Sequence, residues 1–534
     1  MKEQDLLESF SGINEELLKR SENNKKTESN ETKAAEKSNA KAGSSWRKLG
    51  YIAAVLMLTA GLIILFIHIS NKNDSDVSDI QGQKIANKES EKVAEGGTGS
   101  EFLKTYIVSA AEYPTALKKP DFHDFDLNGD NTWDGDENKA YFEALQKWGN
   151  LVAEQKNIEG YDPDAGKKGI LSFNSKAIGQ FLKENNHENR VYSPINIYIA
   201  LGMLAETSEG NTRKQILDLL GIETIDTLRI QMKGLWNSVY SDDKIKSILA
   251  SSIWLRDDME YNKETMDSLA RNYYNSSFSG KMGSEEYSEA YRSWLNDQTD
   301  GILKEQISGL ELNQDAIMSL ATTVCFSAKW LDEFNKNDTT LDTFHTASGD
   351  IKCDFMHRST QGAYYWGDKF GAIVNWFDGA MGYMSYILPD DGVSVYDLLQ
   401  DEQVMNFVNQ GLEYGQSKRV IINMSIPKFD VSSKQDIVGN LENLGITDAF
   451  DITKADFSPV ADSSENIFIN KVEHGVRVIE DEEGVKAAAY TVEDYATAAM
   501  PPEEKVDFVV DRPFMFVISY GNGIPMFIGI VENP

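Results

Sequence analysis

The chain has 534 residues, of which 41% are hydrophobic and 26% are charged, so it can bury a large core and still carry appendages. Its formal net charge of -33 at pH 7 argues against nucleic acid as a partner, because a polyanion would be repelled. We therefore expect an acidic protein of more than one segment, with a soluble body that is secreted or exposed at the cell surface.

Residues 1–48 mix lysine and glutamate almost evenly and include a Ser/Asn/Lys/Glu-rich tract, which predicts a disordered cytoplasmic tail. Residues 49–69 then contain no Lys, Arg, Asp or Glu. At ~1.5 Å per residue, a helix of this length spans about 30 Å, the thickness of the hydrocarbon core of a bilayer. We expect one transmembrane helix here, because a cleaved signal peptide would have a shorter apolar region nearer to Met1.

The distribution of basic residues predicts the orientation of this helix. Lysine and arginine are frequent between Lys33 and Lys48, whereas Lys72 is nearly alone just after the helix. The positive-inside rule then places the N-terminus in the cytoplasm and the rest of the chain outside. We expect a single-pass protein of the cell membrane, in which residues 70–105 form a flexible linker because they are polar and poor in apolar side chains.

Residues 106–168 are predicted to be an acidic extension that contains an EF-hand-like loop. Six oxygen-bearing residues occupy positions one, three, five, seven, nine and twelve of such a loop, which suits calcium. These candidate ligands are Asp126, Asn128, Asp130, Thr132, Asp134 and Glu137, with Thr132 contributing its carbonyl. Position six is Asn131, where glycine is usual, and no second complete loop accompanies it. Two interpretations stay open, a calcium site and an acidic turn that binds nothing.

A globular domain is predicted from residue 169 to the end of the chain, and its first marked stretch reads as a buried helix. Ser193 is placed to cap the helix, and Pro194 suits its first turn. Ile197, Leu201 and Leu204 recur at helical spacing.

Further motifs follow in order along this domain. They are Trp294–Gly301 at a helix end, Leu320–Phe334 as a strand, Pro427–Phe429, Leu444–Ile446, Asp448–Phe450 and Ile469–Val476. Two cysteines cannot form a disulfide framework, and we expect both Cys325 and Cys353 to be free and buried.

The segment from Val478 to Met500 is acidic at first and then rich in alanine, without a helical apolar stripe. Alternate positions in its first part are small or β-branched, so that face could slip between two existing strands. An exposed alanine-rich loop is the other interpretation of the local pattern. Two apolar strands, within 511–518 and 524–534, end the chain.

Together these motifs, in this order over residues 169–534, resemble the serpins, proteinase inhibitors whose exposed reactive loop inserts into the central sheet after cleavage. The resemblance implies an α+β serpin fold with about three β-sheets, about eight to nine helices and a reactive-centre loop near the C-terminus. With the transmembrane helix before it, the chain resembles a membrane-anchored bacterial-type member with an N-terminal extension.

The resemblance also implies roles for particular residues. A strand-opening region would comprise Ser193, Asn196, Thr322, Trp330 and His474, with His474 structural rather than catalytic. Asn196 and Thr322 depart from the family, which usually has Ser and Asn there. The loop hinge would comprise Glu482, Gly484, Val485, Lys486, Ala487, Ala488, Ala489 and Thr491. Counting from Gly484 gives Ala498–Ala499 as the reactive bond, with the bonds on either side of it as alternatives.

The function implied is a suicide-substrate inhibitor that traps the acyl-enzyme of a serine protease in a covalent complex. Alanine before the cut suits a small specificity pocket, so elastase-like or subtilisin-like targets are expected. A non-inhibitory serpin acting as a binding or chaperone module on the cell surface is the alternative. The chain has no G-x-S-x-G, H-E-x-x-H or Gly-rich phosphate loop, so we expect no enzyme activity. No cofactor is required, and calcium stands as the open candidate.

Overall fold

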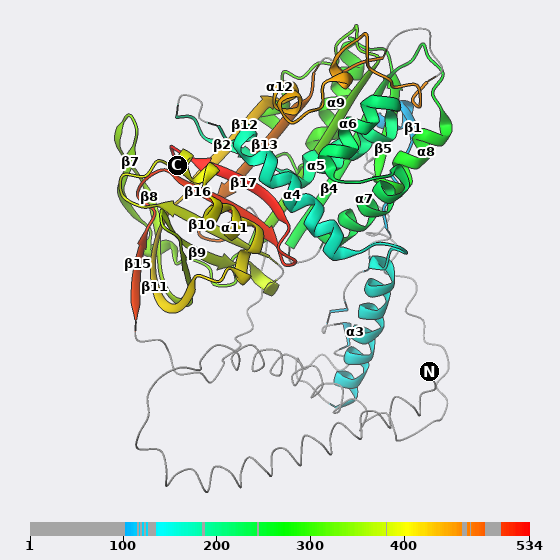
Figure 1. Cartoon of the computed structure of the whole chain (residues 1–534). Helices are drawn as coiled ribbons and strands as arrows, with labels where there is room; N and C mark the ends of the chain where they lie inside the picture. The colour runs from blue at the N-terminus through cyan, green and yellow to red at the C-terminus, as the bar shows by residue number, and fades with distance from the viewer. Residues whose placement is uncertain are drawn as a thin grey trace, which may run out of the picture. The chain divides into compact units, whose positions relative to one another are not determined.

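The computed structural model describes residues 102–114, 117, 120–121, 124–125, 135–183, 187–242, 245–380, 382–461, 467–469, 471–485 and 504–534. All of these belong to one compact unit, Ile85–Pro534 (Figure 1). No helix within these ranges is both long and apolar enough to cross a membrane. The transmembrane helix expected at residues 49–69 lies outside them.

Eight of the described strands form a central sheet in the order β1-β5-β4-β6-β14-β13-β12, with β3 paired to β4. Their bounds are β1 Ile107–Ser109, β3 Ser241–Asp242, β4 Ile245–Arg256, β5 Asn275–Gly280, β6 Met318–Lys329, β12 Phe429–Asp436, β13 Glu473–Glu480 and β14 Gly484–Val485. β4 and β5 run parallel, and the other neighbours are antiparallel.

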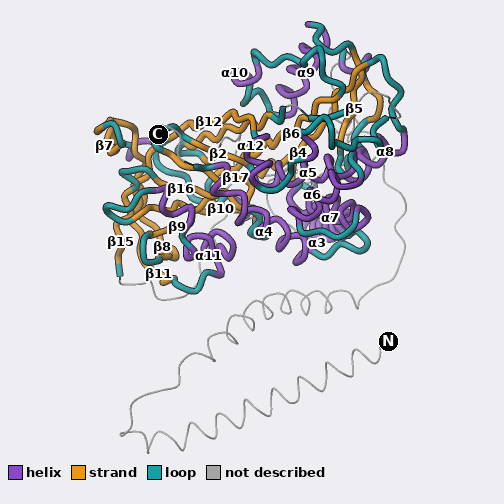
Figure 2. The backbone as a smooth tube through the Cα atoms, turned by 45° about the horizontal axis from the view of Figure 1, so that its top comes forward, coloured by secondary structure: helices purple, strands orange, loops and turns teal. Residues whose placement is uncertain are grey.

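The central sheet is buried on both faces, as the side chains of β4 show. Leu249, Ile253 and Leu255 belong to one apolar cluster, whereas Ala250 and Trp254 belong to another. This alternation follows from the two-residue period of a strand. In Figure 2 the strands β4, β5 and β6 accordingly lie between α9 and α10 on one side and α5, α6 and α7 on the other.

Nine described strands form a second sheet in the order β15-β11-β8-β9-β10-β16-β17-β2, with β7 paired to β8. Their bounds are β2 Arg190–Tyr192, β7 Thr340–Thr346, β8 Gly349–Trp366, β9 Phe370–Trp376, β10 Gly382–Pro389, β11 Ser417–Pro427, β15 Lys505–Val509, β16 Phe514–Tyr520 and β17 Pro525–Val531. The described strands therefore form two sheets rather than the expected three. The reason is that β8 is long enough to pair with β7, β9 and β11, which joins all of these strands into one sheet.

The helices surround the two sheets. They are α3 Gly135–Lys156, α4 Pro163–Phe181, α5 Pro194–Thr207, α6 Gly210–Leu220, α7 Ile225–Val239, α8 Lys263–Asn272, α9 Glu285–Gln298, α10 Lys304–Ile307, α11 Glu402–Gln410 and α12 Val438–Asn443. The predicted start of α5 is confirmed, because the Ser193 side chain accepts a hydrogen bond from the Asn196 backbone N–H at 3.4 Å and Pro194 is the first helical residue. The two predicted C-terminal strands are confirmed as β16 and β17.

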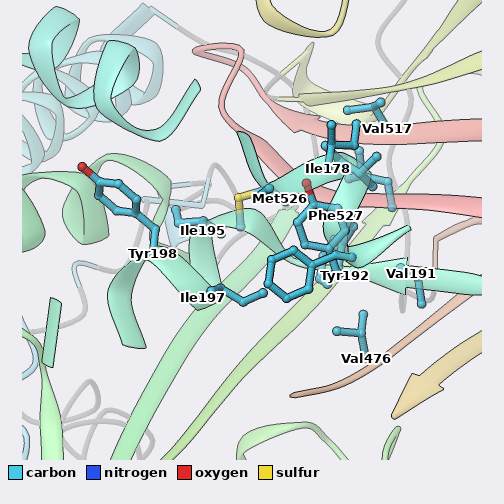
Figure 3. Packing of buried hydrophobic residues seen from close by; sticks show 14 of the residues in the cluster. Ile178, Val191, Tyr192, Ile195, Ile197, Tyr198, Val476, Val517, Met526 and Phe527 are labelled. Carbon is cyan, nitrogen blue, oxygen red and sulfur yellow. The ribbon is translucent and has the colours of Figure 1, made fainter. Parts of the chain in front are cut away.

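The largest core cluster joins α5 to both sheets. Figure 3 shows four buried members of this cluster, which are Ile197 of α5, Tyr192 of β2, Val476 of β13 and Phe527 of β17. This cluster therefore connects the central sheet, the helix beneath it and the C-terminal strands.

The N-terminal part of the described chain corrects one expectation. A short 3-10 helix, η2, spans Leu103–Thr105, and β1 follows it. The side chain of Leu103 is 0% exposed, so Leu103–Thr105 do not belong to a flexible linker, although they lie within the range 70–105 expected for one. Helix α4 begins at Pro163, before Gly169, where the globular domain was expected to begin.

Candidate functional site

The two-residue strand β14 lies between β6 and β13 in the central sheet. Gly484 pairs with Lys329 and Val485 with Ala328 on β6, while Val485 also pairs with Glu480 on β13. Gly484 has a φ of +154°, and a Cβ at this position would lie 2.2 Å from the carbonyl oxygen of Ala328. Only glycine therefore lets the backbone approach β6 this closely.

The turn that leads into β14 is held by residues just after β6. The backbone N–H of Trp330 donates to the carbonyl of Glu483 at 3.0 Å, and its indole N–H donates to the carbonyl of Asp481 at 3.0 Å. The Phe334 N–H donates to the carbonyl of Glu482 at 2.9 Å. Trp330 is buried, so the structure places it beside the first residues of the loop, with its polar atom satisfied.

Glu482 is a carboxylate that is 5% exposed at this turn. Lys428 forms an ion pair with it at 3.0 Å, and the Thr339 hydroxyl donates to it at 2.9 Å. Burial alone would raise the pKa of Glu482, but hydrogen bonds from its own backbone N–H, Lys428 and Thr339 outweigh burial and lower it. The carboxylate is thus charged at neutral pH and holds the turn to Lys428 and Thr339, the residues just before β12 and β7.

Beyond β14, the strands β6 and β13 face each other across a gap that we call the slot. Among the described residues, β6 pairs with β4 and β14, and β13 pairs with β12 and β14, but no ladder joins β6 to β13. A cavity of about 20 Å³ lies along the slot. Its lining includes Asn196, Val324, Phe326, Val476, Val478 and Val485. The slot therefore presents two strand edges to a further strand.

The start of α5 and the histidine of β13 meet under the slot. The backbone N–H of Ser193 donates to Nε2 of His474 at 3.1 Å. Burial lowers the pKa of His474 to about 4, so the ring is neutral at pH 7 and its Nε2 acts as the acceptor. Asn196 is buried nearby, and its Oδ1 has no hydrogen-bond partner within the described part of the chain. These contacts tie α5 to β13.

Thr322 and Thr323 lie on the edge strand of the slot, β6. Thr322 is half-buried and borders cavities on both faces of the sheet, of about 30 Å³ beside α5 and about 40 Å³ beside α9. Thr323 is buried, and its hydroxyl has no partner among the described residues. The five residues expected in the strand-opening region thus all lie around the slot, with Trp330 at the turn that leads into β14.

Comparison with known proteins gives a family for this arrangement. A family model described as "Serpin (serine protease inhibitor)" matches residues 169–534. The chain belongs to the serpin family. Members of this family are generally protease inhibitors rather than enzymes, so the expectation that the chain is not an enzyme is confirmed by its family.

Curated relatives cover most of the serpin region. The human leukocyte elastase inhibitor is 26% identical over 365 residues, which are 66% of this chain and 95% of the relative. An uncharacterised serpin-like protein of Methanosarcina acetivorans is 28% identical over 368 residues, which are 65% of this chain and 82% of that protein.

Solved serpin structures share the fold. The thermophilic serpin tengpin in its native state has a TM-score of 0.62 and 25% identity, over 71% of this chain and 96% of tengpin. Arabidopsis AtSerpin1 in its native stressed conformation has a TM-score of 0.61 and 23% identity, over 70% of this chain and 99% of that one.

The buried carboxyl group of Glu480 was not predicted from the sequence. Glu480, at the end of β13, is 1% exposed and accepts a hydrogen bond from the Tyr386 hydroxyl. Burial raises the pKa of Glu480 to about 8; the Tyr386 hydrogen bond lowers it and the charge of Asp481 raises it further. The two-residue period of the strand could have predicted that Glu480 is buried. Val476 and Val478 point inward on β13, and Glu480 occupies the next inward position.

Other predicted site residues lie outside the described ranges. They include the hinge residues Lys486, Ala487, Ala488, Ala489 and Thr491, the reactive bond Ala498–Ala499, and the candidate calcium ligands Asp126, Asn128, Asp130, Thr132 and Asp134. Glu137 is described, at the start of α3, where it is 4% exposed. Neither cysteine forms a disulfide, and Cys325 is buried as expected, but Cys353 is partly exposed, so the expectation that it is buried was wrong.

Proposed function

We propose that this serpin inhibits serine proteases as a suicide substrate. The observation that supports this most directly is the position of β14, in line with the slot: both of its residues pair with β6, and Val485 also pairs with β13. Strand addition at such edges gains a ladder of backbone hydrogen bonds on each side. A loop that is cut beyond the hinge gains the freedom to extend this strand.

The geometry suggests how trapping follows. The target's serine attacks the carbonyl carbon of the reactive bond, the bond to the next residue breaks, and the loop end stays attached as an acyl-enzyme ester. About fifteen residues from Gly484 onward, at ~3.3 Å each, would form roughly 50 Å of new strand. Such a displacement carries the attached protease away from the loop's starting position and disrupts its catalytic geometry before water hydrolyses the ester.

The target class follows from the residue before the cut. Alanine at position 498 fits a small, apolar specificity pocket, so we propose elastase-like or subtilisin-like proteases. The name of the human relative, leukocyte elastase inhibitor, agrees with this class. We further propose that the chain is anchored in the cell membrane by residues 49–69, with the serpin domain outside and with calcium bound at residues 126–137.

Incubation with a panel of elastase-like, subtilisin-like and trypsin-like proteases tests the proposal. A covalent complex that survives a denaturing gel is expected with at least one enzyme of small-residue specificity. Mass spectrometry of the released C-terminal peptide would locate the reactive bond. Cleavage of the loop by every enzyme without a stable complex would instead favour the non-inhibitory binding or chaperone function.

A further inference from the structure

Residues 102–114 form a segment that we call the strap, which precedes the region matched by the serpin family model and wraps over the outer edge of the central sheet. Its strand β1 pairs with the edge strand β5, with Ile107 opposite Phe278 and Ser109 opposite Ser277. The strap therefore replaces β5 as the edge of the sheet. Figure 1 shows β1 beside β5 and α8.

The first half of the strap packs on the face of the sheet that α9 covers. Leu103 is fully buried in the apolar cluster that contains Trp254 of β4 and Trp294 of α9. The ring of Tyr106 lies 5.0 Å, centroid to centroid, from the ring of Tyr287 in the first turn of α9. The strap thus holds the N-terminal end of α9 against the sheet.

The second half of the strap packs on the opposite face. The Glu112 N–H donates to the carbonyl of Ala270 in α8 at 3.2 Å. The ring of Tyr113 stacks on Trp236 of α7 and on Tyr274, with centroid distances of 5.5 and 5.9 Å. The strap therefore contacts both faces of the sheet and links α9, β5, α8 and α7 to one another.

Helix α9 also covers the slot. A cavity of about 40 Å³ lies between α9, β6 and β13, and its lining includes Tyr291, Leu295, Thr323 and Gly475. An inserted strand would direct every second side chain toward this face. The cavity has room for about three water molecules, since each requires ~10–15 Å³. Because it is too small for a row of side chains, α9 must shift outward when the slot fills.

We propose that the strap is a brake on loop insertion, which pins the first turn of α9 to the edge of the sheet and opposes the shift that insertion requires. The proposal rests on the proposed inhibitory function, because it concerns the same slot. A strap that is released, or weakened by changes in the segment before it, would let the sheet open faster.

Variants of the strap in the full-length protein test this proposal. The double variant Leu103→Ser with Tyr106→Ala removes the contacts with α9, and Tyr113→Ala removes the stacking on the other face. The matched control is Val108→Ser, because Val108 lies in the same strand with its side chain 46% exposed. The loop is cut with a protease that forms no complex, and insertion is followed by tryptophan fluorescence and by the gain of heat stability.

We expect the double variant to insert about tenfold faster than the parent, which corresponds to about 1.4 kcal/mol of contact present in the native state and broken in the transition state. Tyr113→Ala should move in the same direction, and Val108→Ser should match the parent. Equal rates in the double variant, Tyr113→Ala, Val108→Ser and the parent would overturn the brake. If the cut parent itself never gains heat stability, the proposed insertion fails, which is a separate result.

A cysteine pair tests the same idea in the opposite direction and does not depend on weakening the fold. Ser109→Cys with Ser277→Cys places two thiols opposite each other in the β1–β5 ladder. The oxidised protein should insert more slowly than the same protein after reduction, with the parent under both conditions as control. Equal rates before and after reduction would show that the strap does not move during insertion, which would contradict the proposal.

Discussion

Two buried ionisable residues on β13 give this serpin opposite responses to pH. The pKa of His474 is lowered from 6.5 to about 4, so the native state loses stability as pH falls from 6.5 toward 4, because the unfolded chain takes up a proton that the folded chain excludes. The pKa of Glu480 is raised from 4.5 to about 8. Its contribution to the stability of the native state is therefore full below pH 4.5 and is lost as pH rises through 8, because the unfolded chain releases a proton that the folded chain retains. Over its full pH range, the effect is about 3 kcal/mol for His474 and about 5 kcal/mol for Glu480.

We therefore predict a stability maximum in mildly acidic solution, measured as the midpoint of urea unfolding between pH 4 and pH 9. Glu480→Gln should flatten the alkaline side, and His474→Gln should flatten the acidic side while its amide oxygen still accepts the Ser193 N–H. His345→Gln is the control, since this histidine is exposed. If the stability of Glu480→Gln falls at alkaline pH as much as that of the parent, other groups cause the decline.

The residue before the reactive bond should determine which proteases are trapped. We predict that Ala498→Arg shifts complex formation from elastase-like to trypsin-like enzymes, because this side chain enters the primary specificity pocket. The measurement is the second-order rate of complex formation with each enzyme, with Ala499→Ser as a matched control on the other side of the bond. A variant that keeps its preference for elastase-like enzymes, or a cut between Glu493 and Tyr495, would show that the assumed register is wrong.

At the scale of elements, the sequence predicts what local patterns determine. The N-cap of α5, its apolar spacing, and the apolar runs of β16 and β17 are visible in short windows, and the structure has them. The strand β14 is two residues long, and the pairing of β1 with β5 joins segments far apart in the chain. No local period encodes such pairings, so the slot and the strap emerge only from the folded arrangement.

The buried position of Val485 in β14 leads to a prediction at the scale of elements. Val485 is buried and borders the cavity along the slot together with Phe326 and Phe527. Val485→Arg would place a charge where desolvation costs several kcal/mol, so β14 should leave the sheet and insertion should slow relative to hydrolysis of the acyl-enzyme. The ratio of trapped complex to cleaved product on a denaturing gel should fall strongly.

Lys486→Arg is the matched control for this variant, because it puts the same side chain one position further along, on the face expected to point to solvent. It should retain the parent's ratio of complex to cleaved product. An unchanged yield of complex in Val485→Arg would mean that the insertion face has been assigned to the wrong residues.

At the scale of the whole molecule, the serpin domain and the acidic extension before it are expected to respond to different signals. The serpin domain has its own core, which joins both sheets through α5. The sequence of the candidate calcium loop instead contains four carboxylates, Asp126, Asp130, Asp134 and Glu137, whose mutual repulsion a divalent ion would relieve if the loop brought them together. Binding should therefore order the extension and leave the serpin domain nearly unchanged.

We predict that calcium protects residues 121–147 from proteolysis and produces heat in a calorimetric titration of the whole protein, in which the strap keeps its contacts with the serpin domain. Glu137→Gln, nearly the same shape without the charge, should lose both effects, because position twelve supplies a bidentate carboxylate in such loops. Loop cleavage and complex formation should be nearly the same with calcium and with a chelator. If millimolar calcium produces neither heat nor protection, the acidic turn is a solvated connector that does not bind calcium. A calcium-dependent change in loop insertion would show that the extension and the serpin domain are coupled.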